Sequence, residues 1–452
     1  MKNNLIRIFS LKETLIFIIF VKHVVFICAC PINLENDTAE YCRQALSLLG
    51  LLPETDNFNF HPPGYAIILA LANFIFGEYT LYSLLIFQHL LCFTTTIYLI
   101  NICSRSKIIY VFILITSVTT FSCNSILTES IVSSLLLFSV CCFIQVHKGN
   151  LSNTSLTLLS VSLSLLIIMK TVFFFMVFPA LFLLYKTPSF RTYHYFKFTL
   201  IVITLPLISM SINYIRWDKF MLSDRSELHL YNRVVAKDKT VDPNGKFFLT
   251  LKAQIKDDKN IFSGHWNSRN ILIKKGFSFD ETVNLLGNVS IEGIKYNYFN
   301  FLTNTVYHFF DDFFIEPSFG YFFDYKLVDN YDYITTLFGK SYIDDYYQYS
   351  IDYRQLKPFI ILIRLNNIFY NKIILLSLLL YTLYNYIKVN KYFIIYTFPF
   401  FFVFFLHTTF EVSTPRYAIT LYSILPFILT VLLGELKTLF NYLKSSKTKV
   451  SN

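Results

Sequence analysis

Ionisable side chains are rare beside the apolar stretches of this chain, so the few that occur there are the first candidates for chemistry. Such groups are costly at the edge of an apolar region and usually serve a function there. A carboxylate in this position can deprotonate a hydroxyl or bind a divalent metal. Three acids and three bases share this setting: Asp37, Glu129, Glu411, Lys170, Arg364 and Arg416.

Asp37 is the strongest of these candidates, because a second motif follows it. It lies seven residues beyond the apolar run 15–30, in the segment Asn36-Asp37-Thr38-Ala39-Glu40-Tyr41. Asp37 followed by Glu40 three residues later also resembles a helix capping box. The segment His61-Pro62-Pro63-Gly64-Tyr65 follows, and its prolines and glycine predict a rigid turn. The lone histidine His61 is either structural or a ligand of an acceptor or metal.

The remaining candidates each carry a structural alternative. Lys170 ends an apolar stretch, where a lysine can simply extend its ammonium to the interface. Glu129 either supports a metal, or orients Asp37, or caps a helix at the interface. Arg416 could pair with Glu411 for structural reasons. Two further features are weaker. Arg233 follows an apolar helix and could touch a sugar or phosphate. The acidic pair Asp311-Asp312 resembles a metal-binding pair but is more typical of a solvated face.

The composition indicates an integral membrane protein. Of 452 residues, 54% are hydrophobic and 15% are charged, against about 25% charged residues in soluble proteins. The net charge of +10 fits basic cytoplasmic loops better than nucleic-acid binding. The eight cysteines lie mostly in apolar stretches, so their spacing predicts neither a disulfide framework nor a zinc site.

Apolar periodicity predicts an all-α polytopic protein with about ten transmembrane helices, in a range of eight to twelve. Lys and Arg in alternate loops place both termini in the cytoplasm. We expect the run 15–30 to be an uncleaved first helix; a cleaved signal peptide is the alternative. The run Gly64–Phe76 is too short to cross and is interpreted as an interfacial helix. The predicted spans are 15–30, 79–103, 108–123, 130–146, 151–169, 172–185, 198–214, 369–387, 393–406 and 417–433.

Three regions follow from these spans. Residues 1–216 form an N-terminal transmembrane module whose first external loop is 31–78. Residues 217–357 form an external segment, expected to be a small α or α+β insert. Within it, the aromatic stretch 299–323 is interpreted as a helix at the membrane surface. Residues 358–452 carry the C-terminal helices and a basic tail.

Several short motifs resemble the GT-C glycosyltransferases, and more narrowly the family of dolichyl-phosphate-mannose:protein mannosyltransferases and aminoarabinose transferases acting on lipid A. The first loop is the most specific, with Asp37, Tyr41 and His61-Pro62-Pro63-Gly64-Tyr65. Other matches are short: Leu127-Thr128-Glu129-Ser130, Met169-Lys170-Thr171, where many members have Arg-Pro, and Pro415-Arg416-Tyr417-Ala418-Ile419. The segment 217–357 matches no motif of this family.

The resemblance implies an inverting transfer of a sugar from a polyprenyl-phosphate donor to an acceptor hydroxyl on the external face. By analogy, Asp37 is the general base or orients the acceptor, assisted by Glu129. Cations at the phosphate stabilise the leaving group, and this role falls to Lys170 and Arg416. Tyr41, His61, Arg233 and Tyr417 complete the predicted substrate-binding set.

The resemblance leaves the cofactor, the acceptor and the compartment open. A divalent metal such as Mg²⁺ or Mn²⁺ is not required by it; if one binds, Asp37, Glu129 and His61 are the expected ligands. The acceptor is a lipid, a glycan or a protein. The compartment is a bacterial inner membrane in preference to the endoplasmic reticulum.

Three other interpretations compete with a glycosyltransferase. A lipid-linked-sugar flippase or polysaccharide transporter would need a polar pathway across the membrane. A catalytically degenerate scaffold would keep the fold and tolerate loss of Asp37, and the change from Arg-Pro to Lys170-Thr171 leaves it open. A polysaccharide polymerase or ligase also carries a large outer loop, but such loops are usually rich in arginine.

Overall fold

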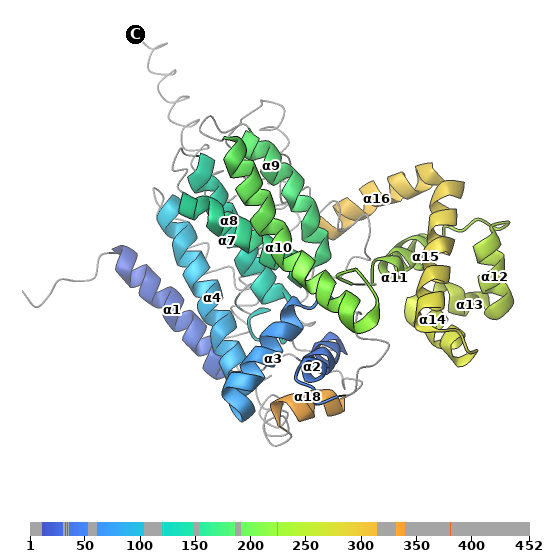
Figure 1. The fold of residues 1–452 in the computed structure, drawn as a ribbon, viewed down its shortest axis with the longest axis horizontal. Coiled ribbons are helices and arrows are strands. Elements are labelled where there is room, and N and C mark those ends of the chain that lie inside the picture. The colour runs from blue at the N-terminus through green and yellow to red at the C-terminus, as the bar shows by residue number, and fades with distance from the viewer. Residues whose placement is uncertain are drawn as a thin grey trace, which may run out of the picture.

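The structure is a computed structural model, and its described part is helical. It describes residues 11–29, 32, 34, 36–52, 61–103, 120, 122–147, 153–185, 191–223, 225–313, 331–339 and 380. These residues form helices and turns with no strand between them (Figure 1). The predicted all-α class is therefore confirmed for the described part of the chain.

Three apolar segments in the described part are long enough to cross a membrane. They are Gly64–Ile102, Glu129–Val146 and Thr192–Trp217. The last of them, α10, has 26 residues and a length of about 39 Å at 1.5 Å per residue. The hydrocarbon core of a bilayer is about 30 Å thick. Two shorter apolar helices, Asn153–Met169 and Thr171–Phe182, accompany them.

These helices pack as a bundle in which α7 (Glu129–His147) lies between α4 (Thr80–Cys103) and α8 (Asn153–Met169). On one flank α10 (Thr192–Trp217) packs on α8, and on the other α1 (Leu11–Ala29) packs on α4 (Figure 1). Small side chains allow the central helices to approach closely, which is typical of membrane bundles.

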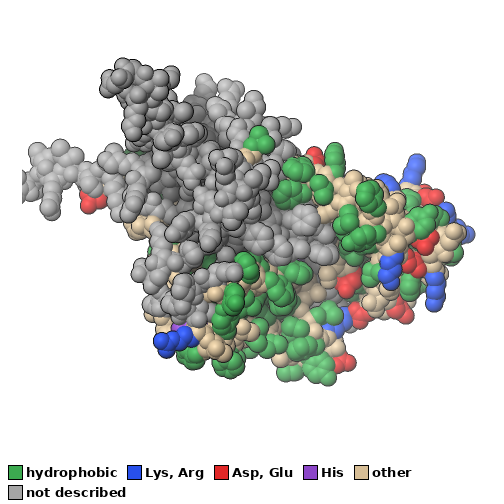
Figure 2. All heavy atoms as spheres, turned by 90° about the horizontal axis from the view of Figure 1, so that it is seen from above, with side chains coloured by type: hydrophobic (Ala, Val, Ile, Leu, Met, Phe, Trp, Pro, Cys, Tyr) green, Lys and Arg blue, Asp and Glu red, His purple; other side chains and the backbone are tan. Residues whose placement is uncertain are grey.

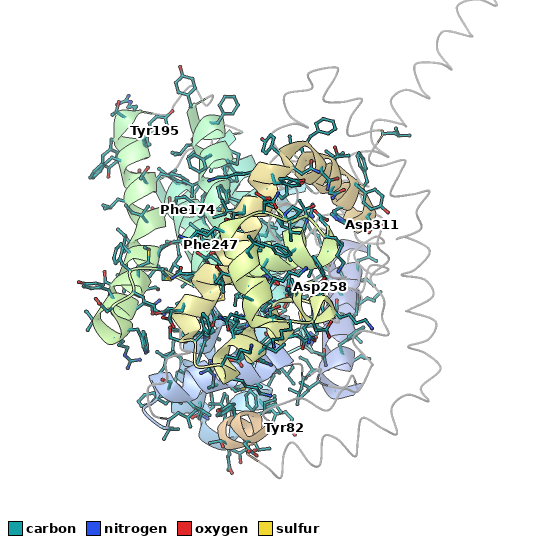
Figure 3. All side chains as sticks on the ribbon, turned by 90° about the vertical axis from the view of Figure 1, so that its right-hand side faces the viewer. Tyr82, Phe174, Tyr195, Phe247, Asp258 and Asp311 are labelled. Carbon is teal, nitrogen blue, oxygen red and sulfur yellow. The ribbon has the colours of Figure 1, made fainter. Side chains whose placement is uncertain are left out.

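α4 and α10 begin at opposite ends of the bundle (Figure 3). Tyr82 near the start of α4 and Tyr195 near the start of α10 lie at opposite ends of the bundle (Figure 3). The 3₁₀ turn Thr171–Met176 and α9 (Val177–Tyr185) lead from α8 towards α10. The predicted spans 393–406 and 417–433, all of 369–387 except Leu380, and most of 108–123 lie outside the described residues.

The first loop forms two helices at one end of the bundle. α2 (Asn36–Leu48) packs against α3 (Gly64–Phe76), and α3 has the bounds expected from the sequence. A 3₁₀ turn, Gly77–Tyr79, joins α3 to α4. Gly77 adopts φ 53° there, a backbone conformation that glycine reaches without strain.

The segment after α10 folds around a core of its own. It consists of α11 (Arg225–Tyr231), a π-helical turn (Asn232–Lys237), α12 (Lys246–Gln254), α13 (Asp258–Phe262), α14 (His265–Lys274), α15 (Phe279–Tyr296) and α16 (Tyr298–Phe313). We call residues 225–313 the helical insert. The sequence leaves the class of this insert open between α and α+β, and its described residues are all-α. Charged side chains gather over the insert, whereas the described surface of the bundle is largely hydrophobic (Figure 2).

One helix of the predicted external segment packs on the first loop and not within the helical insert. α18 (Tyr331–Phe338) packs on α2, and Ile334, Leu337 and Phe338 are buried in the hydrophobic core shared with the bundle helices (Figure 1). The Asn73 side-chain amide donates to the Leu337 carbonyl at 2.9 Å. The described residues of segment 217–357 therefore contribute to two cores.

Candidate functional site

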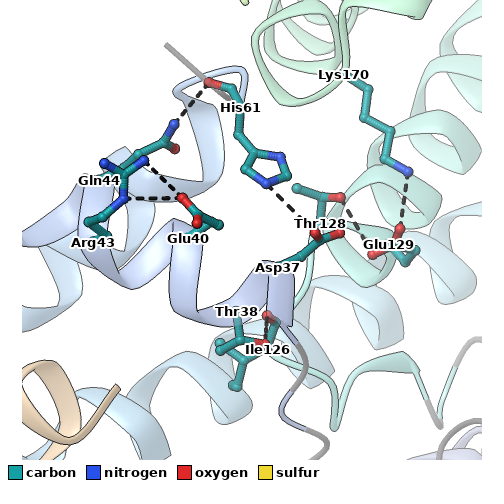
Figure 4. Close-up of polar contacts among 10 residues, drawn as sticks. All are labelled: Asp37, Thr38, Glu40, Arg43, Gln44, His61, Ile126, Thr128, Glu129 and Lys170. Atoms are coloured by element: carbon teal, nitrogen blue, oxygen red, sulfur yellow. Dashed lines mark hydrogen bonds and ion pairs between the residues drawn. The ribbon is translucent and has the colours of Figure 1, made fainter. Parts of the chain in front are cut away.

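Asp37 is positioned by the packing of α2 against the segment that precedes α7. The buried face of α2 carries Ala39, Cys42 and Leu46, which fixes the rotation of the helix about its axis. At its first turn the Thr38 hydroxyl donates to the Ile126 carbonyl at 3.0 Å (Figure 4). The side chain of Asp37, one residue earlier, stays 16% exposed.

His61 lies next to Asp37. Its Nε2 is 3.8 Å from Asp37 Oδ1, and its side chain is only 4% exposed. The distance is too long for a hydrogen bond, but it allows an electrostatic contact when the imidazole is protonated. The Gln44 side-chain amide donates to the His61 carbonyl at 3.3 Å and holds this end of the loop on α2.

Two tyrosines connect this pair to the bundle. The ring of Tyr41 lies 4.4 Å from that of His61 and 5.0 Å from that of Tyr65, between centroids. The Tyr65 hydroxyl donates to Gln88 Oε1 of α4 at 3.1 Å. Tyr41 and Glu129 are electrostatic neighbours of that hydroxyl. Tyr41 therefore links His61 to Tyr65, and Tyr65 links this group to α4.

Glu129 and Lys170 form an ion pair between two helix ends. Lys170 Nζ is 3.1 Å from Glu129 Oε1; the carboxylate side chain is 4% exposed and the lysine side chain 17% (Figure 4). Glu129 is in the first turn of α7, where the helix dipole favours a negative charge. Lys170 has an extended backbone, φ −146° and ψ 117°, at the break between α8 and the following 3₁₀ turn.

Gly64 permits the close approach of the first loop to Lys170. A Cβ at this position would lie 2.7 Å from the Ile168 carbonyl oxygen and 3.0 Å from Met169 Sδ. Only glycine therefore fits between the start of α3 and the end of α8. The motif His61-Pro62-Pro63-Gly64-Tyr65 thus combines a turn with a close backbone contact.

The structure brings five of the predicted site residues together: Asp37, Tyr41, His61, Glu129 and Lys170. Glu40, considered as part of a capping box, forms an ion pair with Arg43 at 2.8 Å. Arg416, Tyr417, Glu411 and Arg364 lie outside the described residues.

Arg233 has a structural environment in the helical insert. Its side chain is fully buried, and its guanidinium is paired with Asp238 and 5.7 Å from the Phe301 ring centroid. His308 of α16 completes this group, with Nε2 2.9 Å from Asp238 Oδ1. Burial alone would raise the pKa of the Asp238 carboxyl. His308 and Arg233 donate hydrogen bonds to this carboxylate and place positive charge beside it, and together these effects outweigh burial, so the pKa of Asp238 is lowered. We call Arg233, Asp238 and His308 the insert triad.

The acidic pair Asp311-Asp312 lies in the last turn of α16. The expected helix over 299–323 is described as far as Phe313. Several hydrophobic side chains of α16 are exposed, namely Phe299, Leu302, Val306, Tyr307 and Phe310. An exposed apolar face of this kind is typical of a helix that contacts a membrane surface.

Three residues of the site were not singled out from the sequence: Gln44, Tyr65 and Gln88. The signal for Gln44 was its spacing. Asp37, Tyr41 and Gln44 recur at i, i+4 and i+7 in α2 and therefore share one helix face. Tyr65 was visible in the proline–glycine motif, whereas Gln88 lies in an apolar stretch without a local pattern.

The site combines the accessible carboxylate of Asp37, the neighbouring imidazole of His61 and the ammonium of Lys170, which the buried Glu129 carboxylate neutralises. This arrangement can accept a proton at Asp37 and hold an anion at Lys170. Among the described residues, no three His, Cys, Asp or Glu side chains are placed to hold a metal ion.

No family model, curated protein or solved structure matches the chain. The proposal below therefore depends on the geometry of the site and on the motifs of the sequence.

Proposed function

We propose that this protein is an integral membrane glycosyltransferase. It transfers a sugar from a polyprenyl-phosphate donor to an acceptor hydroxyl on the external face, with inversion at the anomeric carbon. The observation that carries the proposal is the placement of Asp37 and His61 beside the Glu129–Lys170 ion pair at the ends of α7 and α8. A base and a phosphate-binding cation then face one substrate region.

Asp37 acts as the general base. The acceptor oxygen forms a bond to the anomeric carbon and gives its proton to the Asp37 carboxylate, while the bond from that carbon to the phosphate oxygen breaks. The phosphate leaves with the bonding electron pair. His61, 3.8 Å from Asp37, orients the carboxylate. The Tyr41 ring, which is tilted by 43° against the His61 ring, forms an apolar wall for the acceptor.

Lys170 stabilises the leaving phosphate. Its ammonium is partly exposed and already held by Glu129, so its position is fixed before the donor arrives. A preorganised cation lowers the barrier because negative charge rises on the phosphate oxygens during the reaction. Arg416 and Tyr417 are proposed as further contacts to the donor, and no step of the proposed reaction uses a metal.

The surrounding fold supports a lipid-linked donor. We place about ten transmembrane helices in a bilayer of about 30 Å core thickness, with both termini in the cytoplasm. α2, α3 and α18 then form an external layer over the bundle, and α3 lies at the interface. A bacterial inner membrane is the proposed location, and the acceptor is a lipid, a glycan or a protein.

Asp37→Asn tests the proposal. We expect this change to lower turnover by about 10²–10⁴-fold, the range that a general base supplies, because the amide cannot accept the acceptor proton. The measurement is the release of polyprenyl phosphate by protein purified into lipid and offered a panel of radiolabelled polyprenyl-phosphate sugars.

Glu40→Gln is the matched control. Glu40 is in the same helix and forms a local pair with Arg43, so we expect nearly normal turnover. Absence of turnover with every donor, together with Asp37→Asn cells that behave as the wild type, would contradict a glycosyltransferase and favour a transporter or scaffold.

A further inference from the structure

Gln88 of α4 is a polar side chain inside an apolar helix, and it is 1% exposed. Its amide nitrogen donates to the Cys123 carbonyl at 2.8 Å and to the Ser125 carbonyl at 3.1 Å. Its amide oxygen accepts from the Tyr65 hydroxyl at 3.1 Å. Since only the nitrogen of the amide can donate, the two carbonyls determine which way the side chain is turned. The proposed transfer reaction assigns no role to this residue.

The two carbonyls belong to a buried, non-helical stretch that leads into α7. We call residues 123–128 the pre-α7 segment, and each of them is buried. Backbone carbonyls in an apolar bundle are stable only when they have hydrogen-bond partners. Gln88 provides two of these partners from α4. The placement of Glu129, the first residue of α7, therefore depends on the Gln88 side chain.

The pre-α7 segment also holds the start of α2. The Thr38 hydroxyl donates to the Ile126 carbonyl at 3.0 Å (Figure 4). Both residues are buried, so water does not compete for this hydrogen bond. Because Asp37 directly precedes Thr38, a displacement of Ile126 is transmitted to the proposed base.

The oxygen of the Gln88 amide reaches the His61 side of the site. Its partner Tyr65 belongs to the proline–glycine turn, and the Tyr65 ring lies 5.0 Å from the Tyr41 ring between centroids. Tyr41 in turn lies 4.4 Å from His61, again between ring centroids. One amide therefore joins the first loop to the pre-α7 segment.

The next residue of α4 fixes the pre-α7 segment from the side of α1. His89 Nε2 is 2.8 Å from the Asn124 side-chain oxygen, and the Asn124 amide donates to the Phe26 carbonyl at 3.1 Å. Phe26 is in the last turn of α1, where helical carbonyls have no partner within the helix. α4 thus holds this segment through two successive side chains, so loss of the Gln88 bonds alone should shift the segment without unfolding it.

We propose that Gln88 is a positioning residue, whose amide sets the placement of the Asp37–His61 pair relative to the Glu129–Lys170 pair. This role rests on the proposed function, in which the two pairs act on one substrate region. Gln88 itself touches no substrate. Loss of its hydrogen bonds displaces the base relative to the cation, and a displacement of about 1 Å can lower turnover about 10²-fold.

Tyr65→Phe and Gln88→Met test this role in graded steps. The first removes one hydrogen bond and keeps the aromatic ring, and the second removes all three at similar side-chain volume. We expect kcat to fall about tenfold in Tyr65→Phe and about 10²-fold in Gln88→Met. The KM for the donor should stay nearly unchanged, because Lys170 keeps Glu129 as its partner. The measurement is the release of polyprenyl phosphate from radiolabelled polyprenyl-phosphate sugars by the full-length protein in lipid nanodiscs.

Tyr98→Phe and Gln145→Met are the matched controls. The Tyr98 hydroxyl donates to Gln145 Oε1 at 2.8 Å, so the same type of hydrogen bond joins α4 to α7 nearer the other end of both helices. Both changes should leave kcat unchanged. If kcat is equal in Tyr65→Phe and Tyr98→Phe, the role of Gln88 is only structural and the proposal is wrong.

A spectroscopic readout separates this role from the proposed function. Of the nine histidines, His61 is assigned by nuclear magnetic resonance in protein isotope-labelled at histidine Cε1, by comparison with His61→Gln. Its resonance should shift in Tyr65→Phe and Gln88→Met and stay unchanged in Tyr98→Phe. An unmoved His61 resonance in both test variants would overturn the positioning role. A shifted resonance without turnover of any donor by the wild-type protein would support the placement of His61 by Gln88 and contradict the proposed function.

Discussion

The charge balance between Glu129 and Lys170 is the residue-scale property on which the site depends most. The Glu129 side chain is 4% exposed and lies 3.1 Å from the Lys170 ammonium. A buried carboxylate without its cation is destabilising, because its lost hydration is no longer offset. The pair therefore stabilises the junction of α7 and α8 as well as offering a cation to a phosphate.

A double-mutant cycle measures this pair. We expect Lys170→Met to destabilise the protein more than Lys170→Met combined with Glu129→Gln, since the double variant leaves no unpaired buried charge. The coupling should fall within about 0.5–3 kcal/mol, measured by thermal unfolding in detergent. Additive effects of the two changes would show that the pair contributes nothing to stability.

Individual side chains were predictable where a local motif surrounds them. Asp37 and His61 were found because their neighbours in the sequence predict a helix start and a turn. His23 was missed, because it lies inside an apolar run and its partner His89 comes from α4. Arg233 was expected to touch a substrate, whereas the structure buries it with Asp238; a sequence position alone does not reveal such a partner.

At the scale of elements, the close contact between α3 and α8 holds His61 near Lys170. We expect Gly64→Ala to destabilise the protein by about 1–3 kcal/mol, as overpacking does, because its Cβ would meet the Ile168 carbonyl at 2.7 Å. It should also lower kcat/KM, because His61 moves away from Lys170. Gly50→Ala is the control. Its φ of 72° strains an alanine, so stability should fall, but nothing lies within 4 Å of the new Cβ and kcat/KM should stay unchanged. Equal kcat/KM in the Gly64→Ala and Gly50→Ala variants would contradict the role of the α3–α8 contact in positioning the site.

The insert triad makes the stability of the helical insert depend on pH. Because the pKa of Asp238 is lowered in the folded state, the stabilisation is complete above the carboxyl's ordinary pKa. It is lost as pH falls below about 4 and the folded group takes up a proton. We expect acid unfolding of the insert in that range, followed by the fluorescence of Trp266, which is 4.1 Å from the Arg269 guanidinium.

Asp238→Asn should remove this acid transition. It leaves the buried guanidinium of Arg233 without its carboxylate, a change that costs about 3–5 kcal/mol. Asp258→Asn removes an exposed pair with Lys252 and should change stability little. If the Asp238→Asn variant still unfolds in acid over the same pH range, the acid transition is caused by the titration of a group other than Asp238.

Element bounds were predictable where proline or glycine marks them. The interval Gly64–Phe76 was correct because Pro62-Pro63 precedes it and Gly77 follows it. The start of α7 was placed within one residue, at Ser130 instead of Glu129. The class of the insert stayed open between α and α+β, since its mixed composition carries no strong period, and its described residues are helical.

At the scale of the whole molecule, α18 joins the first loop to a distant part of the chain. We expect Ile334→Ala to destabilise this layer by about 2–5 kcal/mol, as is usual for truncation of a buried side chain. Hydrogen exchange should then increase in α2, on which α18 packs. Thr336→Ala, at an exposed position of α18, should leave exchange in α2 unchanged; equal protection in both variants would contradict the role of α18.

The packing of α18 on α2 was not predictable from the sequence. Its eight residues have no pattern that distinguishes them from the rest of the external segment. The docking depends on a surface formed by α2 and α3, which is a property of the folded layer and not of any local stretch. Membrane character and helix positions follow from local composition, whereas contacts between distant segments need the three-dimensional arrangement.

The same contact has a consequence for biosynthesis. Asn73 and its partner Leu337 are 264 residues apart. At about 5–20 residues per second, the ribosome needs roughly 13–53 s to pass from one to the other. During that interval the newly inserted first loop exposes the surface that α18 later covers. A nascent chain arrested before residue 331 should therefore be recognised by membrane chaperones or proteases, and release from them should follow the emergence of α18.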